Sequence, residues 1–89
     1  MSNKNTKIER NIQKHPIPKI PPHGYKKINE RSPHGQAIYY NPKEKTYLTP
    51  DVDQHNGGWW KKASKIKNLF NKNIRLGTFD NDGYTPIGD

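Results

Sequence analysis

The sequence contains no cysteine, so neither a disulfide nor a thiolate-bound metal can stabilise the fold. It has no run of about 18 apolar residues, the length that a membrane-spanning helix requires. Its N-terminus lacks the apolar core of a secretory signal. Only 28% of its 89 residues are hydrophobic. We therefore expect one small domain of marginal stability, monomeric and without a membrane anchor.

Acidic residues are also scarce: eight Asp and Glu stand against 16 Lys and Arg, for a net charge of +8. A basic surface releases counterions when it binds a polyanion, so this charge favours nucleic acid as the partner. Solubility alone is one alternative. A membrane surface is another, and it is disfavoured because no basic helix with a strong apolar face appears early in the chain.

The composition changes near residue 35. Residues 1–35 hold eight Lys and Arg against two Glu, and four of the eight prolines lie between Pro16 and Pro22. Proline fixes φ and removes a backbone donor, which favours an extended conformation. We predict a basic Pro-rich arm or linker over residues 1–35 and a folded domain over residues 36–89, whose function the motifs below indicate. Three histidines of the arm are expected to face solvent: His15, His23 and His34.

The pattern after residue 35 predicts an α+β domain. Residues 36–40 and 45–49 are β-rich and flank an Asn-Pro-Lys-Glu turn, which indicates a hairpin. Residues 51–58 are loop-like, and residues 59–71 repeat apolar side chains at helical spacing. Residues 73–79 read as a strand with a bulge at Gly77, 80–83 as a turn and 84–87 as a last strand. This order predicts a small twisted antiparallel sheet with one main helix.

The loop at residues 51–58 contains the densest group of side chains that could act in catalysis. In an extended loop, alternate residues share one side, which would place Asp51, Asp53 and His55 together. A metal-free ribonuclease needs a base for the 2′-hydroxyl proton, an acid for the leaving 5′-oxygen and a cation for the phosphate charge. An imidazole with its ordinary pKa near 6.5 suits acid or base work, and Lys61 or Lys62 could supply the charge.

Other interpretations of the same residues remain open. Asp, Asn and Gly are ordinary turn residues. A calcium loop is disfavoured because Asn56 stands where that loop needs Gly and Lys62 where it needs a bidentate Glu. A transition-metal nuclease centre could use Asp51, Asp53 and His55. A His-Asn-His nuclease is disfavoured because its second His is missing. The pair Trp59 and Trp60 could stack on bases, although at least one is expected in the core.

Several segments, taken together, resemble a known class of bacterial toxin. The most specific is the Asp-x-Asp-x-His-Asn-Gly-Gly block at 51–58 followed by Trp-Trp-Lys. The other segments arrive in the expected order, at residues 32–36, 47–50, 75–80 and 87–89. Over about residues 32–89 the chain resembles C-terminal toxin domains of contact-dependent inhibition and other polymorphic toxins. More distantly, it is similar to the ribosome-inactivating ribonuclease domain of certain colicins.

This resemblance implies an endoribonuclease that works without a metal or other cofactor. Its expected target is small-subunit (16S) ribosomal RNA. The toxin would be secreted or delivered at cell contact, and it would act in the cytoplasm of a target bacterium. A cognate acidic immunity protein would neutralise it, and charge complementarity would make capture fast. The rival functions are a non-catalytic basic protein that binds RNA or ribosomes, and a metal-dependent nuclease acting on DNA or RNA.

By position, the resemblance implies a catalytic set and a substrate-binding set. The catalytic set is Asp51, Asp53 and His55 with Lys61, or Lys62 as the second choice. The chain lacks the Glu that follows the His in the colicin pattern, so an Asp would take over its work. The expected substrate-binding residues are Arg75, Trp59, Trp60 and Lys65.

Overall fold

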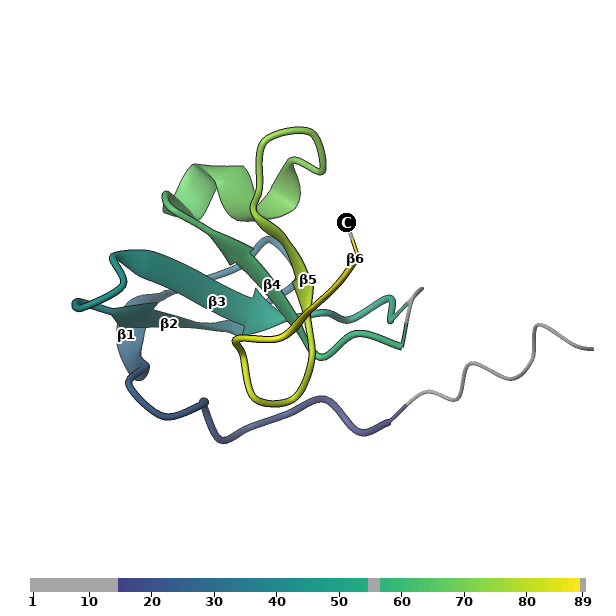
Figure 1. The fold of residues 1–89 in the computed structure, drawn as a ribbon. Coiled ribbons are helices and arrows are strands. Elements are labelled where there is room, and N and C mark those ends of the chain that lie inside the picture. The colour runs from purple at the N-terminus through teal and green to yellow at the C-terminus, as the bar shows by residue number, and fades with distance from the viewer. Residues whose placement is uncertain (1–14, 55–56, 89) are drawn as a thin grey trace, which may run out of the picture.

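The structure is a computed structural model that describes residues 15–54 and 57–88. Within these residues the chain forms one six-stranded antiparallel sheet in which each strand pairs with the next along the chain. Figure 1 shows these strands stacked in chain order, with a short helix over one side. The strands are β1 (Lys26–Arg31), β2 (Ala37–Asn41), β3 (Thr46–Pro50), β4 (Trp60–Ala63), β5 (Gly77–Phe79) and β6 (Pro86–Gly88).

The central hairpin is the one that the turn chemistry predicts. β2 and β3 pair with Tyr39 opposite Leu48 and Asn41 opposite Thr46. The Asn41 side chain accepts backbone N–H groups of Lys43 and Glu44, at 2.9 and 3.0 Å, and so holds the turn. An Asx side chain that satisfies turn amides in this way explains why the chain reverses here. The predicted hairpin is confirmed.

Alternation along the strands divides the apolar residues between the two sides of the sheet. The first face carries a buried cluster of five large side chains: Tyr25, Tyr39, Leu48, Trp60 and Phe79. The second face carries a smaller buried cluster: Ile38, Ala63 and Leu69. The short 3₁₀ helix η2 (Ile66–Phe70) covers the second face, and residues 15–25 run along the first (Figure 1).

The predicted main helix over residues 59–71 is wrong, and with it the α+β assignment. Residues Trp60–Ala63 form strand β4, followed by a single 3₁₀ segment, and the described residues contain no α-helix. The backbone of β4 is paired on both sides, with β3 and β5, and this tertiary pairing overrides a local apolar pattern. Ala63, Ile66 and Phe70 do gather in the second-face cluster, whereas Trp59 packs against the first.

The C-terminal strands are shorter than predicted. β5 begins only at Gly77, because residues 71–76 form turns, with Ile74 and Arg75 both donating to the Asn71 carbonyl oxygen. Gly77 has φ +122°, and a Cβ there would lie 2.8 Å from the Gly88 carbonyl oxygen. The position therefore requires glycine. The turn at 80–83 is present, closed by a bond from the Gly83 N–H to the Asp80 carbonyl oxygen at 2.9 Å.

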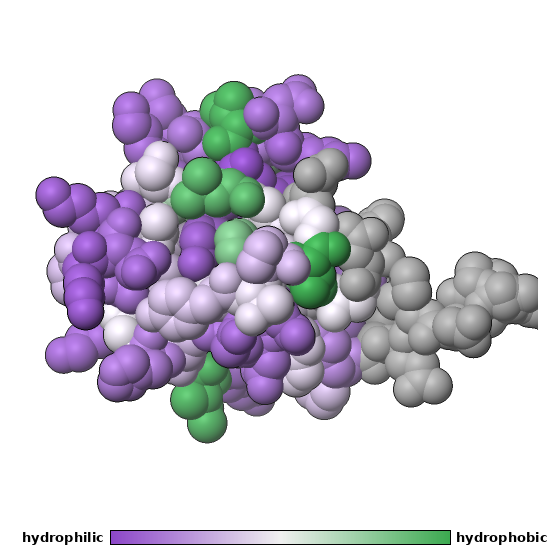
Figure 2. Space-filling view, viewed as in Figure 1, coloured by the Kyte–Doolittle hydropathy of each residue, from purple (hydrophilic) through white to green (hydrophobic). Residues whose placement is uncertain are grey.

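The sheet includes residues from both parts of the chain, 1–35 and 36–89, that differ in composition. β1 lies within the predicted 1–35 arm, yet it pairs with β2. The functional division into a 1–35 arm and a 36–89 nuclease domain stays a prediction. Hydrophilic residues dominate the face of the molecule in Figure 2, and apolar residues form separate spots on it. Among the described residues no helix is long and apolar enough to span a bilayer.

Candidate active site

The 51–58 loop is the connection between β3 and β4, and its two ends are fixed by the sheet. Pro50 pairs with Trp60, and the Asp51 N–H extends the ladder by bonding to the Trp59 carbonyl oxygen at 2.9 Å. The described part of the loop bends instead of running extended, since Gln54 has φ +53°. The predicted extended conformation of the loop is therefore interrupted at Gln54, and the grouping of Asp51, Asp53 and His55 stays a prediction. His55 and Asn56 lie outside the described residues.

The two aspartates of the loop lie in different surroundings. Asp51 is 5% exposed, and its Oδ1 accepts the Gln54 backbone N–H at 3.3 Å. Asp53 is exposed. Asp51 thus acts in part as a turn-forming residue, the role that the simpler interpretation of this loop gave it. Among the described residues no three metal-binding side chains lie together, but the proposed trio includes His55 and is left untested by this.

Gly58 makes room for the Asp51 carboxylate. A Cβ at Gly58 would collide with the Thr78 methyl group and lie 2.9 Å from Asp51 Oδ2. The carboxylate therefore packs against the loop backbone beside Thr78. Thr78 pairs directly with Lys61, and directly paired residues point to the same side of a sheet. Asp51 and Lys61 accordingly lie toward the same face of the molecule.

The two candidate lysines point to opposite sides of β4. Lys61 is partly buried, between Thr49 on β3 and Thr78 on β5. Lys62 is 5% exposed and lies among aromatic rings on the first face. Its Nζ is 4.2 Å from the ring centroid of Phe79 and 4.9 Å from that of Tyr84. Of the two lysines, only Lys61 is on the side where Asp51 packs.

The electrostatics of Lys62 reflect its position. Burial lowers the pKa of the Lys62 ammonium group below its ordinary value, and the carboxylates of Glu44 and Asp82 partly offset this. Cation–π attraction to the surrounding rings favours the charged form. Lys62 is therefore a buried cation held by aromatic residues, and its surroundings are those of a core position.

The four predicted substrate-binding residues are dispersed. Trp60 is 1% exposed in the core, and its Nε1 donates to the Asn81 carbonyl oxygen at 3.2 Å. Trp59 is partly buried next to the loop. The 51–58 loop leads into the Trp60 end of β4. The backbones of Lys65 and Arg75 lie near the opposite end: Lys65 follows Ala63 in the chain, and Leu76, next to Arg75, donates its N–H to the Lys62 carbonyl oxygen. The structure thus brings Trp59 to the loop, but not the backbone of Lys65 or Arg75.

The structure adds His15 to the surroundings of the loop. Its ring stacks on Trp59, with centroids 3.6 Å apart and planes 10° from parallel. Its Nε2 lies 2.9 Å from the Gly58 carbonyl oxygen. The Gln54 side chain accepts the His15 backbone N–H and donates to its carbonyl oxygen, both at 2.9 Å. The expectation that His15 faces solvent is wrong, because an isolated His-Pro gives no sign of partners some 40 positions away.

Comparison with known proteins identifies the class of protein that this sheet and loop belong to. A family model described as Novel toxin 21 matches residues 19–89, so the chain belongs to this toxin family. His15 lies outside the matched residues.

The chain is also 41% identical over 59 residues to the protein named 16S rRNA endonuclease CdiA of Enterobacter cloacae subsp. cloacae. That match covers 63% of this chain and 1% of the relative's length. No solved structure gives a significant match. The two matches confirm the resemblance to toxin domains of contact-dependent inhibition.

Proposed function

We propose that the domain is an endoribonuclease toxin that cleaves small-subunit ribosomal RNA. The observation that carries this proposal is the match over 59 residues to a protein named for 16S rRNA endonuclease activity. Membership of the toxin family and the net charge of +8 agree with a toxic protein that acts on a polyanion.

The chemistry that we assign to the site needs no group beyond the chain and the RNA. A base removes the 2′-hydroxyl proton, the 2′-oxygen bonds to phosphorus, and the phosphorus–5′-oxygen bond breaks. The leaving oxygen takes a proton from the acid, so the products are a 2′,3′-cyclic phosphate and a 5′-hydroxyl. His55 and an aspartate form the acid–base pair, and a lysine stabilises the charge on phosphorus.

The geometry supports a division of labour within this set. Asp51 is buried and accepts the Gln54 amide, which suits a residue that holds the loop. Asp53 is exposed, where an RNA strand could meet it. Lys61 lies on the same side as Asp51, whereas Lys62 is enclosed by rings. We therefore assign Asp53 to proton transfer with His55, and Lys61 to the phosphate.

The same proposal includes delivery and a partner. Delivery at cell contact would bring the domain to the cytoplasm of a target bacterium. An acidic immunity protein would bind the basic domain and cover the 51–58 loop, and charge attraction would speed that encounter.

Purified protein incubated with ribosomes, total RNA and plasmid DNA side by side tests the enzymatic claim. We expect RNA cleavage without plasmid cleavage, and persistence of RNA cleavage in excess chelator. His55→Ala and Asp53→Asn should abolish cleavage, while exposed Lys67→Gln serves as a control. Plasmid cleavage, or complete loss with chelator, would favour the metal-dependent rival.

The binding-protein alternative makes the opposite prediction for the aspartates. A protein that only binds RNA should bind as well or better after Asp53→Asn, because the change removes a negative charge from a basic surface. Toxicity that survives this substitution in a folded protein would support that alternative.

A further inference from the structure

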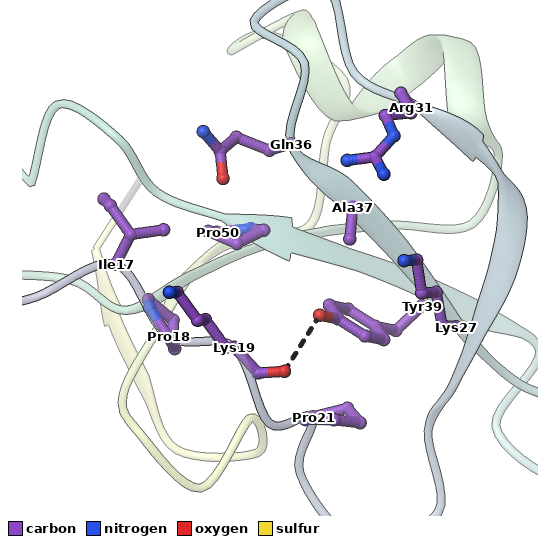
Figure 3. A pocket seen from close by; sticks show the side chains of 10 residues that line it. All are labelled: Ile17, Pro18, Lys19, Pro21, Lys27, Arg31, Gln36, Ala37, Tyr39 and Pro50. Carbon is purple, nitrogen blue, oxygen red and sulfur yellow. Dashed lines mark hydrogen bonds between the residues drawn. The ribbon is translucent and has the colours of Figure 1, made fainter.

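A cleft on the first face of the sheet has a cationic rim and an apolar floor. Its volume is about 580 Å³, and Figure 3 shows it between the N-terminal segment and strands β1–β3. The apolar part of its lining comes from Ile17, Pro18, Pro21, Ala37, Tyr39 and Pro50. Pockets that hold small organic groups fall in the range of about 300–1,000 Å³.

The charged lining is of one sign. Lys19, Lys27 and Arg31 line the cleft with Gln36, and no carboxylate is among the lining residues that the structure describes. Lys19 comes from the N-terminal segment on one side, and Lys27 and Arg31 come from β1 on the other (Figure 3). A ligand in this cleft therefore meets positive charge from two sides.

A bulge in β1 concentrates two of these cations. Lys27 pairs with Tyr39 and Arg31 pairs with Ala37, so four positions along β1 span two along β2. Without this shift in register, Arg31 would fall beyond the end of β2. The irregularity brings both side chains to the first face, over the same cleft.

The Pro-rich run forms the opposite wall. The Lys19 carbonyl oxygen accepts the Tyr39 hydroxyl at 3.3 Å, which ties the segment to β2. Prolines supply an extended wall with few backbone donors that need partners. This gives the prolines of the predicted arm a structural role beside the sheet.

The cleft adjoins the 51–58 loop at two points. Pro50, in its lining, is the residue before Asp51, and Ile17 lies two residues after His15, which contacts Gly58. An anionic strand that crosses the cleft would therefore lead to the loop.

We propose that this cleft binds a nucleotide of the RNA strand where the strand continues past the 51–58 loop onto the first face, the face opposite Lys61. Lys27 and Arg31 contact the sugar–phosphate backbone, and the base lies against the apolar floor, where stacking and apolar contact accept any base. The proposal rests on the proposed ribonuclease function and adds a subsite to it.

The test is binding of a 2′-O-methyl RNA oligonucleotide, which lacks the attacking hydroxyl and cannot be cut. The full 89-residue chain is titrated by fluorescence anisotropy at several salt concentrations. The variant is K27Q/R31Q. The matched control is K67Q/K72Q, which removes the same charge from exposed positions on η2 and the following turn.

We expect K27Q/R31Q to weaken binding about tenfold and to reduce the salt slope by about 1.4, which is about 0.7 for each lost phosphate contact. The control should leave the slope unchanged. Gln36→Glu, a nearly isosteric change that adds one negative charge at the rim, should also weaken binding, and both cleft variants should raise KM with little change in kcat.

Equal weakening by both double variants would overturn the subsite, since the effect would then be general charge. Unchanged RNA binding by K27Q/R31Q would overturn it too, and would leave the cleft to a protein partner. Because binding needs no cleavage, the two proposals fail separately. A wild-type protein that binds but never cuts refutes the ribonuclease, whereas cleavage with an unaltered KM in K27Q/R31Q refutes the cleft.

Discussion

At the scale of the residue, the structure distinguishes side chains that are adjacent in sequence. Lys61 and Lys62 are both plausible from spacing, but alternation along β4 sends one toward Asp51 and the other into aromatic rings. Trp59 and Trp60 differ in burial: Trp60 lies in the first-face cluster, whereas Trp59 is partly buried against the same cluster and lies beside the loop. These choices could not be made from a helical pattern, because a helix would have spread the same residues differently.

Lys61→Met and Lys62→Met should therefore have different consequences. Lys61→Met should lower RNA cleavage strongly with little effect on stability. Lys62→Met should leave stability within about 1 kcal/mol at neutral pH, since an apolar side chain of similar volume replaces a buried cation. Single-turnover cleavage and urea unfolding measure the two effects, and the assignment fails if the losses of activity are reversed.

The lowered pKa of Lys62 predicts a pH dependence of stability. The folded state binds this proton less tightly than the unfolded state does, so stability rises with pH between the folded pKa and the ordinary value of 10.5. Burial raises the pKa of Tyr25 and of Tyr39 above 10.0. The unfolded state therefore loses these protons first, and the folding stability falls as the pH rises past 10.0. The wild type should gain stability relative to Lys62→Met as the pH approaches 10. A flat difference would contradict this.

Gly58→Ala tests the packing of the Asp51 carboxylate. The added methyl group meets the Thr78 side chain and Asp51 Oδ2, so we expect a loss of about 1–3 kcal/mol in unfolding free energy and loss of cleavage. Exposed Ser64→Ala is the control. Wild-type stability and activity in Gly58→Ala would show that the loop does not hold Asp51 as described.

At the scale of the element, strands with a turn between them were predictable and the helix was not. Asn41 and Pro42 favour a turn through their side-chain chemistry, and the flanking segments are β-rich, so the hairpin was predictable. The helix predicted over residues 59–71 was wrong because β4 pairs with a strand on each edge. This long-range pairing cannot be inferred from the spacing of apolar residues within the segment. The contact of His15 with the loop, and the cleft bounded by the Pro-rich run, depend on equally distant partners.

The N-terminal segment is anchored to the loop, and Gln54 is the anchor that can be tested. Gln54→Ala removes both bonds to the His15 backbone and should cost about 1–2 kcal/mol in stability. Gln54→Glu keeps the acceptor but turns a carboxylate oxygen toward the His15 carbonyl oxygen in a buried site, so it should destabilise at least as much as Gln54→Ala. Limited proteolysis between residues 15 and 20 should be slowest in the wild type. Equal protection in all three proteins would exclude an anchoring role.

At the scale of the whole molecule, composition indicated a basic binding surface, and the fold arranges part of that charge around a cleft next to the loop. The family could be recognised from the Asp-x-Asp-x-His-Asn-Gly-Gly block and its neighbouring segments, and the family model that matches residues 19–89 confirms it. The sheet that presents the loop and the lysine that faces it depend on register, which a short sequence pattern does not specify.

The central claim is tested most directly by mapping RNA ends in bacteria that express the domain. Primer extension across small-subunit ribosomal RNA, with chemical typing of the termini, should find a new 5′-hydroxyl end and a matching cyclic phosphate in cells that express the wild-type domain. Neither should appear with His55→Ala. Growth arrest with intact ribosomal RNA, or the same cut with His55→Ala, would contradict the account.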